Sequence, residues 1–265
     1  MKAKTVLVSP YIMINTIGKI RIGISNGYMP GNKATFPHEY QSKSRLHYYS
    51  RFFNTIEVNS CFYKTPLRAT YEKWVADVPD DFRFSLKLSK AITHDAALVA
   101  DISCMENFLA TAAGIGIKKG CLLIQFPGKI TLGHFSQVER LLEQLRISDP
   151  SGEWRKAIEF RNESWYIGET TELLDEFDAT MVIHDFAKAK LATTACKADF
   201  VYMRFHGPAG NYRDAYTAKF LEEKAVEIKT ISASGKDVYA YFNNTIGEAF
   251  ENAGLLHSSC IDGAV

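Results

Sequence analysis

Closely spaced pairs of cysteines are absent from this sequence. The chain has 265 residues and five cysteines, which are widely scattered and never in the C-x-x-C spacing of thiolate metal sites. Their odd number and dispersal also argue against a disulfide framework, which is typical of small secreted domains. We therefore expect a reduced protein in the cytoplasm.

An excess of charge of one sign is also missing. Lys and Arg total 31, and Asp and Glu total 30, so the formal net charge is +1. No overall field draws such a chain to nucleic acid or to an anionic membrane, although a local basic patch can still bind nucleic acid. We expect no association with membranes, and the sequence implies no protein partner.

No stretch of the chain approaches the roughly 20 apolar residues of a membrane-spanning helix. Near the N-terminus an apolar run follows two lysines, but Pro10 and Asn15 interrupt it and no small-residue cleavage site follows. We therefore expect residues 1–19 to be an N-terminal extension and not a secretion signal. No linker or low-complexity tract divides the rest, so residues 20–258 should form one domain, with a tail at 259–265.

Eight short runs rich in β-branched and aromatic residues predict strands. They cover residues 19–25, 55–60, 82–88, 121–126, 156–161, 180–185, 200–207 and 238–244. Helical sequence separates most of them, at residues 45–53, 70–78, 105–116, 135–147, 170–177 and 216–233. Strands that alternate with helices imply a parallel sheet. Eight such units fit an α/β fold of the (β/α)8 TIM barrel type better than an open doubly wound sheet.

Polar residues gather at the carboxyl ends of the predicted strands. In a barrel these ends converge on one mouth, so the side chains would share a funnel. The residues are Ser25, Asn26, Glu57, Asn59, Lys87, Gln125, Glu159, Arg161, His184, Asp185, Arg204, His206, Asn243 and Asn244. A lone polar strand end is commonly a cap or an ion-pair partner, but that interpretation does not explain the coincidence over eight strands. Elaborated loops after the first, third and seventh strands, the latter two at 89–98 and 207–217, should shape the site.

The charges of this funnel suggest anion binding together with proton transfer. Lys87, Arg161 and Arg204 can hold an anion, and the planar fork of Arg suits carboxylate or phosphate. Gly207 follows the seventh strand, where barrels often bind phosphate through backbone N–H groups. The candidates for proton transfer are Glu57, Glu159, Asp185, His184 and His206.

Six motifs, in this order, resemble a known family. EVNSCFYKTP, VPDDFRFSLKLSKAITHD, LLIQFP, AIEFRNESW, ADFVYMRFHGPAGNY and VYAYFNN are similar to the domain-of-unknown-function family 72, also called the YecE-like family. The resemblance runs from about residue 21 to about residue 256. It implies a TIM barrel and a soluble bacterial protein, but no reaction, since the family has no assigned activity.

The resemblance also extends the set of candidate site residues. The family pattern covers Glu57, Asn59, Tyr63, Lys87, Thr93, His94, Gln125, Pro127, Glu159, Arg161, Trp165, Asp185, Arg204, His206, Gly207, Tyr212, Asn243 and Asn244. Among these we expect substrate contacts from Asn59, Tyr63, Lys87, Gln125, Arg161, Trp165, Arg204, Gly207, Tyr212 and Asn243. The sequence departs from the family at SNGYMPGNKATFP (25–37), where the family has a tryptophan-containing stretch, so no ligand contact is carried over there.

Several functions stay open on this sequence. The first is an enzyme of hydrolase, lyase or isomerase type that uses acid–base chemistry on a small anionic substrate, bearing phosphate or carboxylate, or on a sugar-like one. Here Glu57 or Glu159 and His206 would move protons. A Schiff-base lyase built on Lys87 is a variant of this hypothesis.

Two further functions use the same mouth. A divalent metal could assist phosphoester hydrolysis, with nucleic acid as one substrate class, and the carboxylates and histidines are suitable ligand types. The balanced charge and the absence of H-x-H or H-x-x-E spacing weigh against it, so we assign no metal ligand. Alternatively, the protein binds a ligand without chemistry, using exposed aromatic residues at Tyr28, Tyr63, Trp165 and Tyr212.

Overall fold

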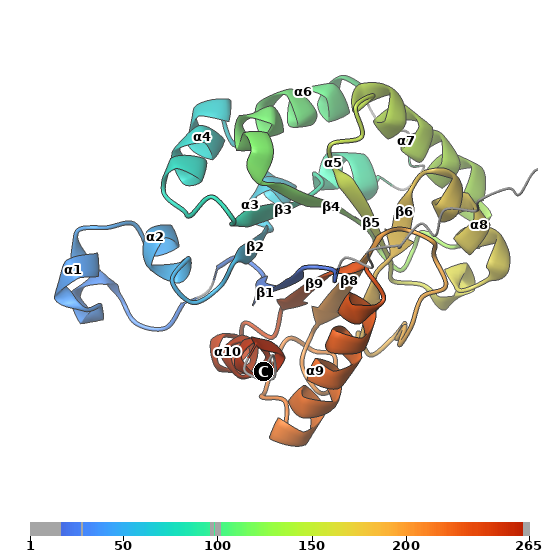
Figure 1. Ribbon diagram of the computed structural model, residues 1–265. Coiled ribbons are helices and arrows are strands. Elements are labelled where there is room, and N and C mark those ends of the chain that lie inside the picture. The colour runs from blue at the N-terminus through green and yellow to red at the C-terminus, as the bar shows by residue number, and fades with distance from the viewer. Residues whose placement is uncertain (1–16, 28, 96–97, 99–101, 262–265) are drawn as a thin grey trace, which may run out of the picture.

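The computed structural model describes residues 17–27, 29–95, 98 and 102–261 of the chain. These residues form nine strand segments, all paired in parallel within two sheets (Figure 1). The strands are β1 (Ile20–Ile24), β2 (Thr55–Val58), β3 (Arg83–Lys87), β4 (Lys119–Phe126), β5 (Arg155–Phe160), β6 (Ala179–Met181), β7 (Ile183–His184), β8 (Phe200–Phe205) and β9 (Asp237–Phe242).

The two sheets meet at two seams. One sheet has the order β2-β3-β4-β5-β6 and the other the order β1-β9-β8-β7. The predicted sixth strand is divided between them at Val182, whose N–H donates to the carbonyl of Ile158 on β5 at 2.8 Å. At the other seam, Ser25 bridges to Glu57 in parallel. The strands thus follow one another around a ring, and the fold is α/β and TIM-barrel-like, as predicted.

Helices lie outside this ring (Figure 1). They are α1 (His38–Gln41), α2 (Arg45–Tyr49), α3 (Ser60–Tyr63), α4 (Arg68–Ala76), α5 (Lys90–Thr93), α6 (Ile102–Ala112), α7 (Phe135–Ser148), α8 (Gly168–Glu176), α9 (Ala218–Ala233) and α10 (Ala249–Ile261), with 3-10 turns η1 (Lys33–Thr35), η2 (Ala113–Lys118), η3 (Leu132–His134) and η4 (Glu163–Trp165). None of the described helices is both long and apolar enough to cross a membrane.

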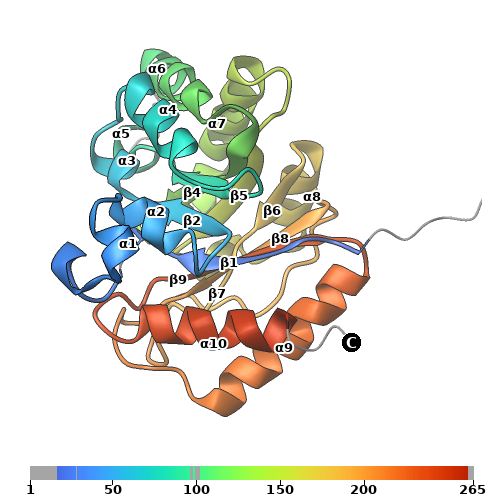
Figure 2. The ribbon, with the colours of Figure 1, turned by 60° about the vertical axis from the view of Figure 1, so that its left-hand side comes forward.

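The ends of the domain differ slightly from the prediction. Strand β1 begins at Ile20, the expected first residue of the barrel. Helix α10 was not predicted from the sequence, and it continues to Ile261, past the expected boundary at residue 258. Helices α9 and α10 lie side by side in both ribbon views (Figure 2). Residues 1–16 of the expected extension and 262–265 of the expected tail lie outside the described residues.

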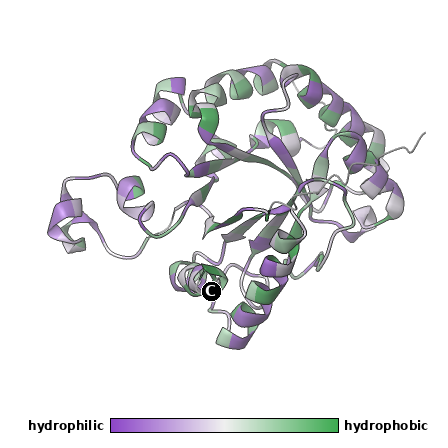
Figure 3. Cartoon of the chain, in the orientation of Figure 1, coloured by the Kyte–Doolittle hydropathy of each residue, from purple (hydrophilic) through white to green (hydrophobic). Residues whose placement is uncertain are grey.

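The long helices form because their apolar residues repeat with the helical period. In α7 the buried side chains are Val138, Leu141, Leu142 and Leu145, which occupy one face at the spacing i, i+3, i+4 and i+7. Hydrophilic and hydrophobic residues accordingly alternate along this helix (Figure 3). Thr217 is the N-cap residue of helix α9, and its hydroxyl accepts a hydrogen bond from the N–H of Phe220 at 3.2 Å.

The interior of the ring is packed with its own apolar cluster, separate from the larger core under the helices. Side chains alternate along a strand, so every second residue points inward. The hydroxyl of Tyr241 lies 2.6 Å from the hydroxyl of Thr55 and 2.8 Å from that of Ser85. At the amino ends of the strands, Arg155 pairs with Asp237 at 2.5 Å. The interior of the barrel is therefore filled by side chains, and the polar groups at its carboxyl end pack against this core.

Candidate functional site

Three charged side chains from three strands meet directly above the packed interior. The guanidinium of Arg204 on β8 donates to both carboxylate oxygens of Glu57 on β2, at 3.0 and 2.8 Å. It also donates to Glu159 on β5 at 2.5 Å. All three side chains are 0–1% exposed. This buried triad joins both sheets and forms the floor of the mouth.

Both carboxylates of the triad stay ionised. Burial alone would raise the pKa of Glu57, but the charge and hydrogen bonds of Arg204 hold that pKa below its usual value. At Glu159, burial again raises the pKa, but the charges of Arg161 and Arg204 outweigh it, so the pKa lies well below the usual value. Ionised carboxylates that already accept from guanidinium groups are poor proton-transfer groups. The geometry therefore favours a supporting role for Glu57 and Glu159 over the predicted acid–base role.

A second layer of polar groups lies above the triad at the ends of β5, β7 and β8. Arg161 donates through Nε to Glu159, through Nη1 to the hydroxyl of Tyr212 at 3.3 Å, and through Nη2 to Nε2 of His206 at 2.9 Å. On the other side of the imidazole, Nδ1 of His206 lies 3.2 Å from the carboxylate of Asp185. We call Arg161, Asp185, His206 and Tyr212 the imidazole half of the mouth.

These contacts fix the protonation state of His206. Arginine can only donate hydrogen bonds, so Nε2 of His206 accepts from Arg161 and carries no proton. The ring proton then sits on Nδ1 and is donated to Asp185. Burial lowers the pKa of His206 to about 4, even though Asp185 opposes this change. At neutral pH the imidazole is therefore neutral, with its basic nitrogen directed at Arg161.

The loop after β8 holds Asp185 in place. The hydroxyl of Tyr216 donates to Asp185 and accepts the backbone N–H of Gly207 at 2.6 Å. Gly207 has φ +96°, and a β-carbon there would lie 2.2 Å from the carbonyl oxygen of Arg213, so the turn requires glycine. The N–H of Gly207, for which the sequence predicts a ligand contact, is bonded to Tyr216 in this structure.

The opposite side of the mouth is built differently. Lys87 at the end of β3 donates to the side-chain oxygen of Gln125 on β4 at 2.8 Å, and its ammonium lies 4.0 Å from the ring centroid of Phe62. The buried Oδ1 of Asn59, at the end of β2, has no hydrogen-bond partner among the described residues. We call Asn59, Lys87 and Gln125 the lysine half of the mouth.

Cations dominate the electrostatics of the lysine half. Burial, followed by the charge of Arg204, lowers the pKa of Lys87 to about 8, so the ammonium still prevails at pH 7. Beside it, His94 has its pKa lowered to about 4, first by burial and then by the positive charges of Lys87, Lys129 and Lys90. This edge of the mouth is therefore locally positive although the whole chain is almost neutral.

Three further residues predicted for the site are Trp165, Tyr63 and Asn243. Trp165 is fully buried, stacks on Phe160 at 4.2 Å between centroids, and donates to the carbonyl of Ile130, so the expectation of an exposed tryptophan is wrong. Tyr63 is 71% exposed on α3. Asn243 follows β9 directly and is largely buried. Tyr28 lies outside the described residues.

His184 is also committed to the protein. Its Nδ1 accepts from the N–H of Phe186 at 3.3 Å, and its Nε2 lies 3.1 Å from the carbonyl of Phe160. Burial lowers its pKa, so the ring is neutral. No three His, Cys, Asp or Glu side chains of the described residues come together in a metal-binding group.

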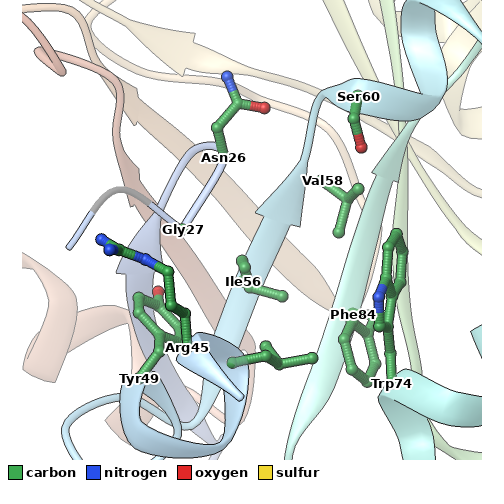
Figure 4. A pocket seen from close by; sticks show the side chains of 10 residues that line it. Asn26, Gly27, Arg45, Tyr49, Ile56, Val58, Ser60, Trp74 and Phe84 are labelled. Carbon is green, nitrogen blue, oxygen red and sulfur yellow. The ribbon is translucent and has the colours of Figure 1, made fainter. Parts of the chain in front are cut away.

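A separate cavity lies outside the strands, behind β2. It has a volume of about 460 Å³, and the outward-facing Ile56, Val58 and Phe84 line it together with Tyr49 of α2 and Trp74 of α4 (Figure 4). The cavity remains because α2 has only five residues and cannot cover the outer face of β2 and β3. Its lining is mostly apolar, in contrast to the mouth.

Some residues of the mouth were not predicted from the sequence. Tyr202 donates to Glu57 at 2.6 Å, and its position two residues before Arg204 on one strand could have indicated it. Phe186 lies beneath the guanidinium of Arg161, at 3.9 Å from the ring centroid. Phe62 comes from the one-turn helix α3 and Tyr216 from the loop before α9, and no periodic signal points to either.

The chain is similar to two curated proteins. It is 26% identical to the UPF0759 protein YunF of Bacillus subtilis over 243 residues, covering 80% of this chain and 84% of the relative. It is 27% identical to the UPF0759 protein YecE of Escherichia coli over 131 residues, covering 49% of this chain and 46% of that protein.

Solved structures show the same fold. A DUF72 family protein from Thermotoga maritima superposes with a TM-score of 0.74 at 25% identity, covering 91% of this chain and 98% of that one. A second, from Enterococcus faecalis, has a TM-score of 0.74 at 21% identity, covering 91% and 95%. The sequence model described as protein of unknown function DUF72 matches residues 21–262. The chain therefore belongs to the DUF72 family.

Proposed function

We propose that this protein is an enzyme that binds a small anionic substrate at the mouth of the barrel and moves a proton through His206. One observation carries the proposal. Lys87 and the two Nη groups of Arg161 donate to neutral acceptors, whereas Arg204 faces carboxylates with all its contacts. Lys87 and Arg161 thus have donors that an anionic ligand can claim.

The affinity for an anion follows from the strength of the competing bonds. A hydrogen bond between two opposite charges adds their Coulomb attraction, which a neutral acceptor cannot supply. A phosphate or carboxylate would therefore displace the amide oxygen of Gln125 from Lys87. Because the surrounding Lys90 and Lys129 add positive charge, a ligand with one or two negative charges would neutralise this edge.

The imidazole half would supply the chemistry. A neutral imidazole whose Nδ1 proton is held by a carboxylate offers Nε2 as a base, and the carboxylate stabilises the imidazolium that forms. In His206 and Asp185 these groups have that relation. Hydrolysis of an activated ester, elimination and isomerisation each begin with such a proton transfer, so the reaction falls in one of these classes.

Ligand binding without chemistry is the second candidate. It is favoured by the contact between Arg161 and Nε2 of His206, because that contact blocks the base in the free protein. The two functions share the anion site and differ only in the fate of the ligand.

Calorimetry with a panel of small anions tests the proposal. We expect at least one phosphate or carboxylate to bind, with an affinity at least tenfold lower for Lys87→Met. A matched control is Lys219→Met, since the side chain of Lys219 is 86% exposed and pairs with Glu223 of the same helix, α9; it should bind like the wild type. If no anion distinguishes the wild type from Lys87→Met, the proposal fails. NMR of the recovered ligand then separates catalysis from binding.

A further inference from the structure

Arg161 has two kinds of partner, and they lie at different edges of its guanidinium. Its Nε faces the carboxylate of Glu159, which anchors the side chain to the floor. Its two Nη groups face the hydroxyl of Tyr212 and the imidazole of His206, both neutral. The Nη edge is the edge that grips a carboxylate or phosphate with two parallel hydrogen bonds.

Arg161 is less deeply buried than the arginine of the floor. One face of the guanidinium covers the ring of Phe186, and the residue is 9% exposed, compared with 1% for Arg204. The bond to Tyr212 is long at 3.3 Å. Exchange of these two neutral partners for an anion would strengthen the contacts of Arg161 without disturbing its anchor at Glu159.

The same contact prevents His206 from acting as a base. A proton on Nε2 would point at the N–H of Arg161, and two donors cannot share a hydrogen bond. The titratable and charged groups that face His206 are Glu159, Arg161, His184, Asp185, Arg204, Tyr212 and Tyr216. Among the described residues, Arg161 is the one that donates to Nε2.

We infer that Arg161 masks His206 in the free protein and that a bound anion removes the mask. The anion takes the Nη edge of Arg161, which leaves Nε2 of His206 with a free electron pair. The substrate proton then moves to Nε2 while the electrons of the broken bond stay on the substrate. The Nδ1 proton stays on His206, hydrogen-bonded to Asp185. Arg161 is a positioning residue here, and the inference rests on the proposed function because it requires the anion site.

NMR titration of the seven histidines in the wild-type protein tests this inference directly. The probe is inorganic sulfate, whose charge stays constant over the titration, with chloride at equal ionic strength as the control for screening. Without sulfate, the pKa of His206 should lie at about 4. With saturating sulfate it should rise above this value, because Arg161 no longer opposes a proton on Nε2, while burial still holds it below that of a free histidine. The variant His206→Gln identifies its signals.

His94 provides a reporter within the same protein. It lies among the lysines of the other half, so a bound sulfate should raise its pKa from about 4 whatever Arg161 does. If His94 responds and His206 does not, the inference is overturned and the anion site of the proposed function stands. If neither responds, the anion site is absent, and both proposals fall.

Arg161→Gln sharpens the test. In this variant the pKa of His206 should already be raised without sulfate, and sulfate should add little. Lys87→Met is the matched control, because it lacks a cation of the mouth that does not contact His206; its His206 should keep a pKa of about 4 without sulfate. An unchanged His206 in Arg161→Gln would overturn the inference. If Arg161→Gln fails to fold, the wild-type titration still decides.

Discussion

In the imidazole half of the mouth, guanidinium, imidazole and carboxylate groups bond to one another, whereas in the lysine half an ammonium bonds to a neutral amide and the oxygen of Asn59 has no partner among the described residues. Both halves rest on the same triad around Arg204. A satisfied network holds its groups rigidly, as chemistry requires. A site with unmatched charge and hydrogen-bonding capacity is where a ligand gains most.

The largest effect should follow from breaking the floor that both halves share. Arg204→Met leaves the buried Glu57 and Glu159 without their common cation, which should lower the free energy of unfolding by about 3–5 kcal/mol. Urea unfolding at pH 7 measures this. Arg68→Met is the control, because the pair of Arg68 with Glu72 is exposed and should contribute less than about 1 kcal/mol. Equal losses in the two variants would show that the triad does not stabilise the fold.

A smaller effect should appear within the imidazole half. The hydroxyl of Tyr216 bridges Asp185 and the N–H of Gly207, so Tyr216→Phe leaves both without this partner. We expect a loss of about 1–2 kcal/mol in the free energy of unfolding. Tyr63→Phe, at an exposed position on α3, should change it by less than about 0.5 kcal/mol. Equal stability of Tyr216→Phe and Tyr63→Phe would show that the hydroxyl of Tyr216 does not stabilise the fold.

The lysine half should respond to pH. Lys87 has a pKa of about 8 in the folded protein and a reference value of 10.5. Between these values the unfolded chain holds a proton that the folded protein has lost, so the free energy of unfolding should rise with pH across this window. Because the side chain of Lys87 is only partly buried and solvent screens some of its charge, we expect only about 1 kcal/mol.

The contribution of Lys87 is isolated by difference. Urea unfolding of the wild type and of Lys87→Met is measured at about pH 7.5 and about pH 10.5. The two measurements give the change in the free energy of unfolding with pH for each protein. The wild type should gain stability over this range relative to Lys87→Met. Identical pH dependence in the two proteins would mean that Lys87 titrates as a free lysine, and the contrast between the halves would weaken.

The sequence predicted the convergence of these groups but not their partners. Glu57 and Arg204 are 147 residues apart, and only the rule that barrel strands end at one mouth brings them together. That rule does not say which cation meets which carboxylate, because pairing depends on side-chain directions and on the stagger of the strands. Arg204 therefore looked like an anion site in sequence and proved to be the centre of the floor.

The other differences also have physical causes. Trp165 follows a polar stretch in sequence, but the turn at η4 directs its ring back onto Phe160. Helix α10 has few charged residues, so its sequence shows no clear polar face. The sixth strand is split because Val182 bonds to β5 while Ile183 and His184 pair with β8. In each case tertiary contacts override a local pattern.

The smallest effect on stability is expected at Asn59, which belongs to the lysine half and has an unpaired side-chain oxygen among the described residues. Removing a buried acceptor that has no partner relieves a desolvation cost of about 1–3 kcal/mol, and the lost packing of the side chain offsets part of this gain. Asn59→Ala should therefore unfold within about 0.5 kcal/mol of the wild type.

Asn252→Ala provides the contrasting control. The side-chain oxygen of Asn252 accepts from the N–H of Tyr216 and from the amide of Asn244, both at 3.1 Å, so its loss should cost at least about 1 kcal/mol. A large loss in Asn59→Ala would reveal a structural partner for its oxygen. If Asn59→Ala has unchanged stability but binds the anion more weakly, the side-chain oxygen of Asn59 accepts a hydrogen bond from the ligand. The polar groups of the lysine half would then serve ligand recognition and not folding.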